Sequence, residues 1–142
     1  MKIAALLSLV LLTFGSVCLR AESFDARAAL GITAGSSVDA AVKRGKKENK
    51  RVLVFALDET KIQGFHIQGM LEFEETKKLV KENFLLVVTD FKDKHIRDQI
   101  GSMGTERPMY FLFDTDGKII QKGSTAMGGS AGAKLVKEWT SK

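Results

Sequence analysis

The chain has 142 residues, a formal net charge of +5 and 44% hydrophobic residues. This length suits a single domain with a core of its own, and so mild a charge does not by itself indicate a nucleic-acid partner. The chain contains one cysteine, Cys18, which excludes a cysteine pair within the molecule.

The first residues have the three-part pattern of a secretory signal peptide. Lys2 precedes an apolar run over residues 3–14, and small residues follow before Ala21. The run is too short to span a bilayer, which needs about 20 apolar residues. We therefore expect residues 1–21 to be a bacterial-type signal peptide cleaved after Ala21, and the mature protein to be periplasmic or secreted.

Loss of the signal peptide would change both the charge and the thiol content. Lys2 and Arg20 lie in it, so 20 of the 22 basic residues remain against 17 acidic ones, a net charge of +3. Cys18 would leave as well, and the mature chain would hold no thiol. Lipidation of Cys18 is the alternative, but Val17 precedes it where a lipoprotein signal has a small residue. We expect no nucleic-acid partner and no stable membrane insertion after cleavage.

Residues 22–36, which are rich in Ala and Gly, are expected to form a flexible, loosely attached segment before one domain over residues 37–142. The expected elements are a helix capped by Ser37 and ending near Asn49, a strand over 51–57, a helix over about 66–82, a strand over 84–88, a short helix within 90–100, strands over 109–113 and 118–121, and a helix over about 130–140.

The strand pattern predicts a mixed sheet. After Arg51, residues 52–57 form a continuous apolar run, and residues 84–88 form a second one; such runs are typical of central strands covered on both faces. The helix between them makes a βαβ unit, so these two strands should be parallel. Asp116 and Gly117 lie between the last two apolar runs and predict an antiparallel hairpin.

This order of elements, with Pro108 just before the third strand, resembles the thioredoxin fold. The stretches 47–56, 78–90 and 108–118 resemble parts of small exported thioredoxin-like domains, including those attached to bacterial disulfide-interchange proteins. The resemblance covers roughly residues 37–140. It implies an α/β fold with a central mixed sheet of four strands, or five, flanked by helices.

The redox motif of that family has no counterpart in this chain. In the family, Trp-Cys-x-x-Cys begins the active-site helix, and a Met often follows three residues later. Counting back from Met70 places Gly64 and Ile67 at the two Cys positions and Gln63 at the Trp position, and counting from Phe73 shifts this by a residue or two. No register supplies a cysteine, so disulfide exchange and enzyme activity are not expected, and no cofactor is implied.

Pro108 matches a proline that is cis in the family and lies against the active-site helix. The residues alone would favour a trans bond, because only about 5–6% of X-Pro bonds are cis. The resemblance, however, implies a cis Arg107–Pro108 bond that faces the start of the helix near His66. Arg107 would then place a charged side chain at the former active site.

The resemblance also marks a candidate binding face. Its residues are Gly64, Phe65, His66, Ile67, Arg107, Pro108 and Met109. We expect a monomeric, redox-inactive domain that binds a protein or peptide partner there. The alternative is a diverged relative of the oxidoreductases that handles copper, with His66, Met70 and Met109 as soft ligands, although methionines more often fill a core. A domain with no functional site also stays open.

Three further patterns have plainer interpretations. A basic run could contact an anionic surface such as lipid headgroups, but a solvated helix face is preferred; its members are Lys43, Arg44, Lys46, Lys47, Lys50 and Arg51. Asp114 and Asp116 resemble the start of a calcium loop that lacks its later acidic ligand, so a turn is expected. His66 and His95 have acidic neighbours without catalytic spacing; those neighbours are Asp90, Asp93 and Asp98.

Overall fold

The computed structural model describes residues 30–58 and 61–141. The expected signal peptide and Cys18 lie outside the described residues. None of the described helices is long and apolar enough to cross a membrane.

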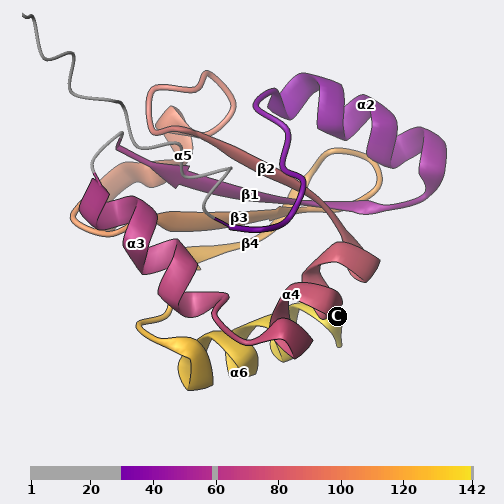
Figure 1. The fold of residues 1–142 in the computed structure, drawn as a ribbon. Helices are drawn as coiled ribbons and strands as arrows, with labels where there is room; N and C mark the ends of the chain where they lie inside the picture. Colours follow the sequence, from indigo (N-terminus) through magenta and orange to yellow (C-terminus); the bar gives the residue numbers. More distant parts are fainter. Residues whose placement is uncertain (1–29, 59–60, 142) are drawn as a thin grey trace, which may run out of the picture.

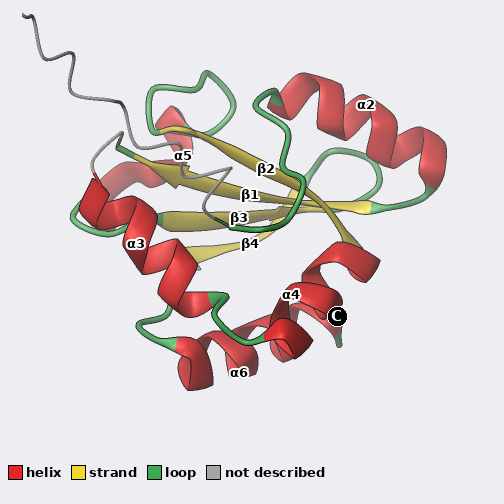
Figure 2. Ribbon diagram, viewed as in Figure 1, coloured by secondary structure: helices red, strands yellow, loops and turns green. Residues whose placement is uncertain are grey.

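Four strands form one mixed sheet in the order β2-β1-β3-β4 (Figures 1 and 2). They are β1 (Arg51–Leu57), β2 (Phe84–Asp90), β3 (Met109–Phe113) and β4 (Ile119–Ser124). β1 is parallel to β2 and antiparallel to β3, and β3 is antiparallel to β4. The mixed α/β sheet and the hairpin are confirmed, and β4 continues to Ser124, beyond the expected residue 121.

Helices cover both faces of this sheet. The helices α2 (Val38–Glu48) and α5 (Arg97–Ile100) lie on one face, and the 3-10 turn η1 (Gly101–Met103) follows α5. The helices α3 (Lys61–Met70), α4 (Glu74–Asn83) and α6 (Gly129–Thr140) lie on the other face (Figure 2). Because side chains alternate along a strand, β1 and β3 contribute to two separate cores.

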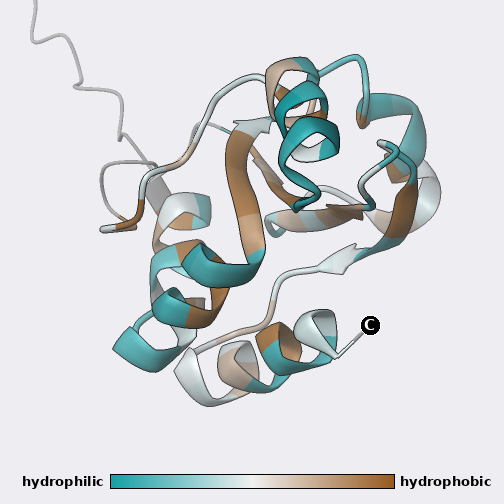
Figure 3. Ribbon diagram, turned by 90° about the vertical axis from the view of Figure 1, so that its right-hand side faces the viewer, coloured by the Kyte–Doolittle hydropathy of each residue, from teal (hydrophilic) through white to brown (hydrophobic). Residues whose placement is uncertain are grey.

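The two cores hold the molecule together. On the α3, α4 and α6 side, Trp139 is fully buried, and its ring packs 4.6 Å from that of Tyr110 and 6.2 Å from that of Phe55, centroid to centroid. On the α2 and α5 side, Val38 and Ile96 pack against the sheet. In Figure 3, hydrophobic residues concentrate on the strands, whereas the helices also carry many hydrophilic residues. Burial of this apolar surface is the main stabilising term.

The helix expected over residues 66–82 is two helices, so that prediction was wrong. α3 ends at Met70 and α4 begins at Glu74, with Phe73 extended at φ −78° and ψ 131°. The break lies where α6 packs most closely, since a Cβ on Gly132 would meet the backbone carbonyl of Met70. Glu74 also starts an acidic first turn, which favours a new helix N-terminus there.

Part of the segment expected to be loosely attached packs on the domain. Leu30 is buried in the core beside α3, α4 and α6, and Ile32 and Ala34 pack against it. Gly35 forms a single parallel bridge to Val87 at the outer edge of β2. The bridge is isolated, and the sheet of the described residues has four strands. The boundaries proposed for the domain stay a prediction.

Candidate binding face

Gln63 joins the start of α3 to the loop that precedes β3. Its side chain is only 3% exposed. Its Oε1 accepts a hydrogen bond of 2.9 Å from the Asp58 N–H at the end of β1, and its Nε2 donates one of 2.8 Å to the Thr105 carbonyl. A buried amide with satisfied hydrogen bonds fixes its neighbours. The first turn of α3 and the loop over residues 101–108 therefore form one face (Figure 1).

Pro108 is held from the other side. It is buried, and its carbonyl accepts hydrogen bonds of 2.9 Å from both the backbone N–H and the Oγ1 of Thr125, which lies after β4. No cis peptide bond occurs in residues 30–58 or 61–141, so the Arg107–Pro108 bond is trans. The cis bond implied by the resemblance was wrong, and the intrinsic trans preference of the peptide bond prevails.

The structure divides the seven predicted face residues into two groups. Phe65 is 54% exposed, and His66 and Arg107 also reach the surface. Ile67 and Met109 are fully buried, in cores on opposite faces of the sheet. The buried residues, which include Gly64 and Pro108, shape the backbone of the face, and a partner would touch the exposed ones.

The proposed copper ligands are not assembled. Met70 belongs to the core beside α3, whereas Met109 belongs to the core on the other side of the sheet. His66 belongs to α3, so it lies on the same face of the sheet as Met70, whereas Met109 packs on the opposite face. The Nδ1 atom of His66 is buried, with no hydrogen-bond partner among the described residues.

Two exposed apolar residues of this face were missed by the sequence analysis. Ile62 is 68% exposed next to Gln63, and Met103 is 38% exposed two residues before Thr105. Together with Phe65 they give the face an apolar character. The sequence analysis named Gln63 only for the Trp position of the family motif. Its spacing, four residues before Ile67 and seven before Met70, also places a polar side chain in the inward stripe of α3.

The other sequence patterns have structural explanations. Asp39, in the first turn of α2, lies 2.8 Å from Lys94 Nζ and 2.8 Å from His95 Nε2, so it ties α2 to the segment before α5. The hydrogen bond from Lys94 lowers the pKa of Asp39, the His95 and Lys43 charges add to this, and Asp39 raises the pKa of Lys94. Asp114 accepts two backbone hydrogen bonds in the hairpin turn.

The comparisons with known proteins bear on the fold. No protein-family model and no curated protein matches the sequence. Among solved structures, the chain is similar to a disulphide isomerase from Xylella fastidiosa Temecula1, with a TM-score of 0.60 and 16% identity over 72% of this chain and 88% of that one. It is also similar to a DsbH oxidoreductase, with a TM-score of 0.55 and 20% identity over 75% of this chain and 83% of that one.

These similarities concern the fold. Counting back from Met70 would place Gly64 and Ile67 at the positions of the redox pair, and counting from Phe73 would shift them by a residue or two; the whole sequence contains one cysteine. Thiolates carry out disulfide exchange, and a single thiol cannot form the pair. The chain therefore has the thioredoxin-like fold found in disulfide oxidoreductases, without the Cys-x-x-Cys motif.

Proposed function

We propose that this protein is a redox-inactive, thioredoxin-like binding module that holds a protein or peptide partner. The partner would contact the face made by the first turn of α3 and the loop over residues 101–108. The observation that carries this proposal is the pair of hydrogen bonds made by the Gln63 side chain. They hold the two segments together although the chain has no cysteine pair for which the segments could form a redox site.

The surface chemistry of this face supports the same proposal. Ile62, Phe65 and Met103 are exposed apolar side chains, and Arg107 adds a charge beside them. Interfaces are enriched in aromatic residues, Met and Arg, and depleted in Lys and Glu at their centre. A partner that covered these side chains would bury apolar area on a backbone that is already ordered, which lowers the cost of binding.

We also propose that the protein works outside the cytoplasm. The support is the pattern of Lys2, the apolar run over residues 3–14 and the small residues before Ala21. Without a disulfide, the exported domain would rely on its two cores for stability.

Site-specific photo-crosslinking in source cells tests the binding proposal. Benzoylphenylalanine would replace Phe65 on the proposed face, and in a matched control it would replace Ile120 on β4. The two side chains are 54% and 46% exposed, so their access to solvent is comparable. We expect a discrete protein adduct from position 65 only.

A second variant makes the test specific. Ile62→Asp places a charge beside Phe65 at a side chain that is 68% exposed, so folding should be unaffected. The adduct from position 65 should then disappear. Equal adducts from positions 65 and 120, or none from position 65, would contradict the proposal.

A further inference from the structure

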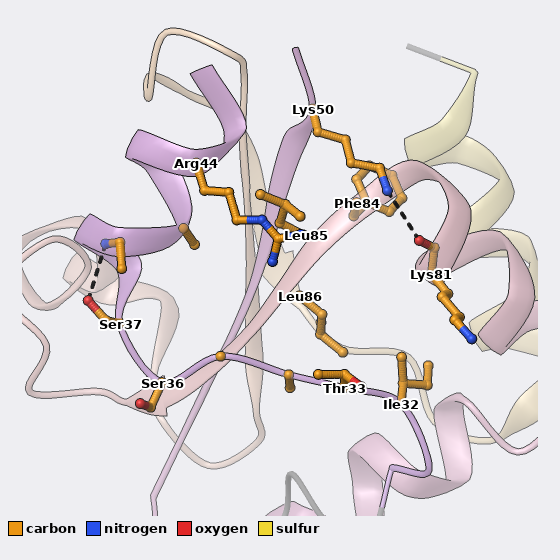
Figure 4. Close-up of a pocket in the computed structure, with 14 residues that line it drawn as sticks. Ile32, Thr33, Ser36, Ser37, Arg44, Lys50, Lys81, Phe84, Leu85 and Leu86 are labelled. Carbon is orange, nitrogen blue, oxygen red and sulfur yellow. Dashed lines mark hydrogen bonds between the residues drawn. The ribbon is translucent and has the colours of Figure 1, made fainter. Parts of the chain in front are cut away.

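A pocket of about 550 Å³ lies at the outer edge of β2, away from the candidate binding face. The segment over residues 32–37, the helix α2 and the start of β2 surround it (Figure 4). This volume lies in the range of about 300–1,000 Å³ that is usual for ligand sites. Gly35, which forms the single bridge to Val87, is one of the residues that line the pocket.

The sheet edge in this pocket offers unused backbone groups. Gly35 donates a hydrogen bond of 2.8 Å to the Leu86 carbonyl and accepts one of 3.0 Å from the Val88 N–H. Alternate residues of a strand direct these groups to the same side, so the Phe84 carbonyl and the Leu86 N–H also point outward. Neither has a hydrogen-bond partner within residues 30–58 and 61–141. An unpaired edge of this kind is a template for another strand.

The side chains around this edge combine apolar and positive character. Leu85 and Leu86 point to opposite sides of β2, so an added strand could pack against both (Figure 4). Lys50 and Lys81 lie at the Phe84 end of the pocket, where Lys50 Nζ is 3.5 Å from the Lys81 carbonyl. Arg44 is 2.6 Å from Glu48, and this hydrogen bond lowers the pKa of Glu48. Because Glu48 balances the charge of Arg44, the net positive charge of the pocket comes from Lys50 and Lys81.

We infer that the outer edge of β2 binds an extended acidic peptide segment by strand addition. One residue of the segment would donate its N–H to the Phe84 carbonyl and accept from the Leu86 N–H, and the carboxylates on its Phe84 side would meet Lys50 and Lys81. The backbone bonds would supply affinity, and the lysines would select acidic side chains. This site is separate from the face proposed above, and each can fail without the other.

A peptide titration followed by amide chemical shifts tests this inference. The probe is a capped hexapeptide in which Val and Glu alternate, added to the purified protein. We expect shifts at Gly35 and Leu86 and none at Phe65. The double variant Lys50→Gln/Lys81→Gln should weaken binding at least tenfold. The matched control, Lys47→Gln/Lys78→Gln, removes the same charge from exposed lysines that do not line the pocket and should bind as the parent does.

Two further probes separate strand addition from general attraction to positive charge. The same peptide with N-methyl groups at alternate residues keeps its carboxylates but loses backbone donors on one edge, and two such peptides cover both edges. At least one should fail to bind. The inference is overturned if both N-methylated peptides bind as well as the parent, if the two double variants weaken binding equally, if the shifts fall on Phe65, or if no binding occurs at millimolar peptide.

Discussion

At the scale of single residues, Gln63 occupies a position where a helix packed on a sheet normally carries an apolar side chain. It is buried, and it bridges the end of β1 to the loop before β3. Removing one partner of a buried hydrogen bond leaves the other group unsatisfied, at a cost of about 1–3 kcal/mol.

We therefore predict that Gln63→Met, which keeps the side-chain volume, lowers the free energy of unfolding by about 1–3 kcal/mol. Urea unfolding measures this change. Gln68→Met is the matched control, because Gln68 is exposed on the same helix, and it should change stability little. An equal loss in both variants would show that the Gln63 bridge does not hold the face.

Asp39 gives a prediction about pH. Because Lys94 lowers the pKa of Asp39 below its ordinary value of 3.8, the folded state favours the charged carboxylate. The stabilisation is therefore present above that value and is lost as the pH falls through the lower pKa of the folded protein. Asp39→Asn should be less stable than the parent at neutral pH, by a small amount because the pair is exposed.

Unfolding at a series of pH values checks this. The stability difference between parent and Asp39→Asn should shrink as the pH falls below 3.8. Asp98→Asn, an exposed site on α5, is the control. A difference between parent and Asp39→Asn that does not change with pH would show that the Asp39 carboxylate is not the group responsible.

Residue patterns predicted only part of the candidate binding face. Phe65 is exposed and His66 is half-buried, whereas the burial of Ile67 and Met109 depends on which side of the sheet each one faces. The spacing of residues along the chain does not show which face of the sheet a side chain packs on until the strand register is known. The trans bond before Pro108 shows that a resemblance can mislead where intrinsic backbone preference points the other way.

At the scale of elements, the strands were predictable and the helix break was not. β1 and β2 each contain a continuous apolar run, over residues 52–57 and 84–88, and runs of this length are typical of buried strands. At the break, α6 approaches Met70 closely through Gly132, about sixty residues later in the chain, and this contact cannot be read from the sequence near Met70. The acidic first turn that starts at Glu74 favours a helix N-terminus, but this local signal does not by itself show that the preceding helix ends at Met70.

Substitution of Gly132, with Gly69 as the matched control, tests the close approach of α6 to the end of α3. A Cβ on Gly132 would meet the Met70 carbonyl, whereas a Cβ on Gly69 would meet no atom within 4 Å. We expect Gly132→Ala to destabilise the protein by about 1–3 kcal/mol through overpacking. Gly69→Ala should stabilise it by about 0.4–1 kcal/mol, because the unfolded chain loses freedom. Thermal unfolding measures both, and a Gly132→Ala variant as stable as the parent would refute the close packing.

At the scale of the whole molecule, the N-terminal pattern predicts processing. Intact mass of the protein from the periplasmic fraction should match a chain that begins near Glu22, because cleavage is expected after Ala21. A mass that includes a diacylglyceryl group on Cys18 would instead establish a lipid-anchored protein.

The chain has a thioredoxin-like fold, and the central proposal is that it is redox-inactive. The most direct measurement is the reduction of insulin disulfides by dithiothreitol, with protein whose intact mass confirms that Cys18 is absent. The account predicts a rate equal to that of dithiothreitol alone, because no thiolate remains to attack a disulfide. Turnover clearly above that rate would contradict it.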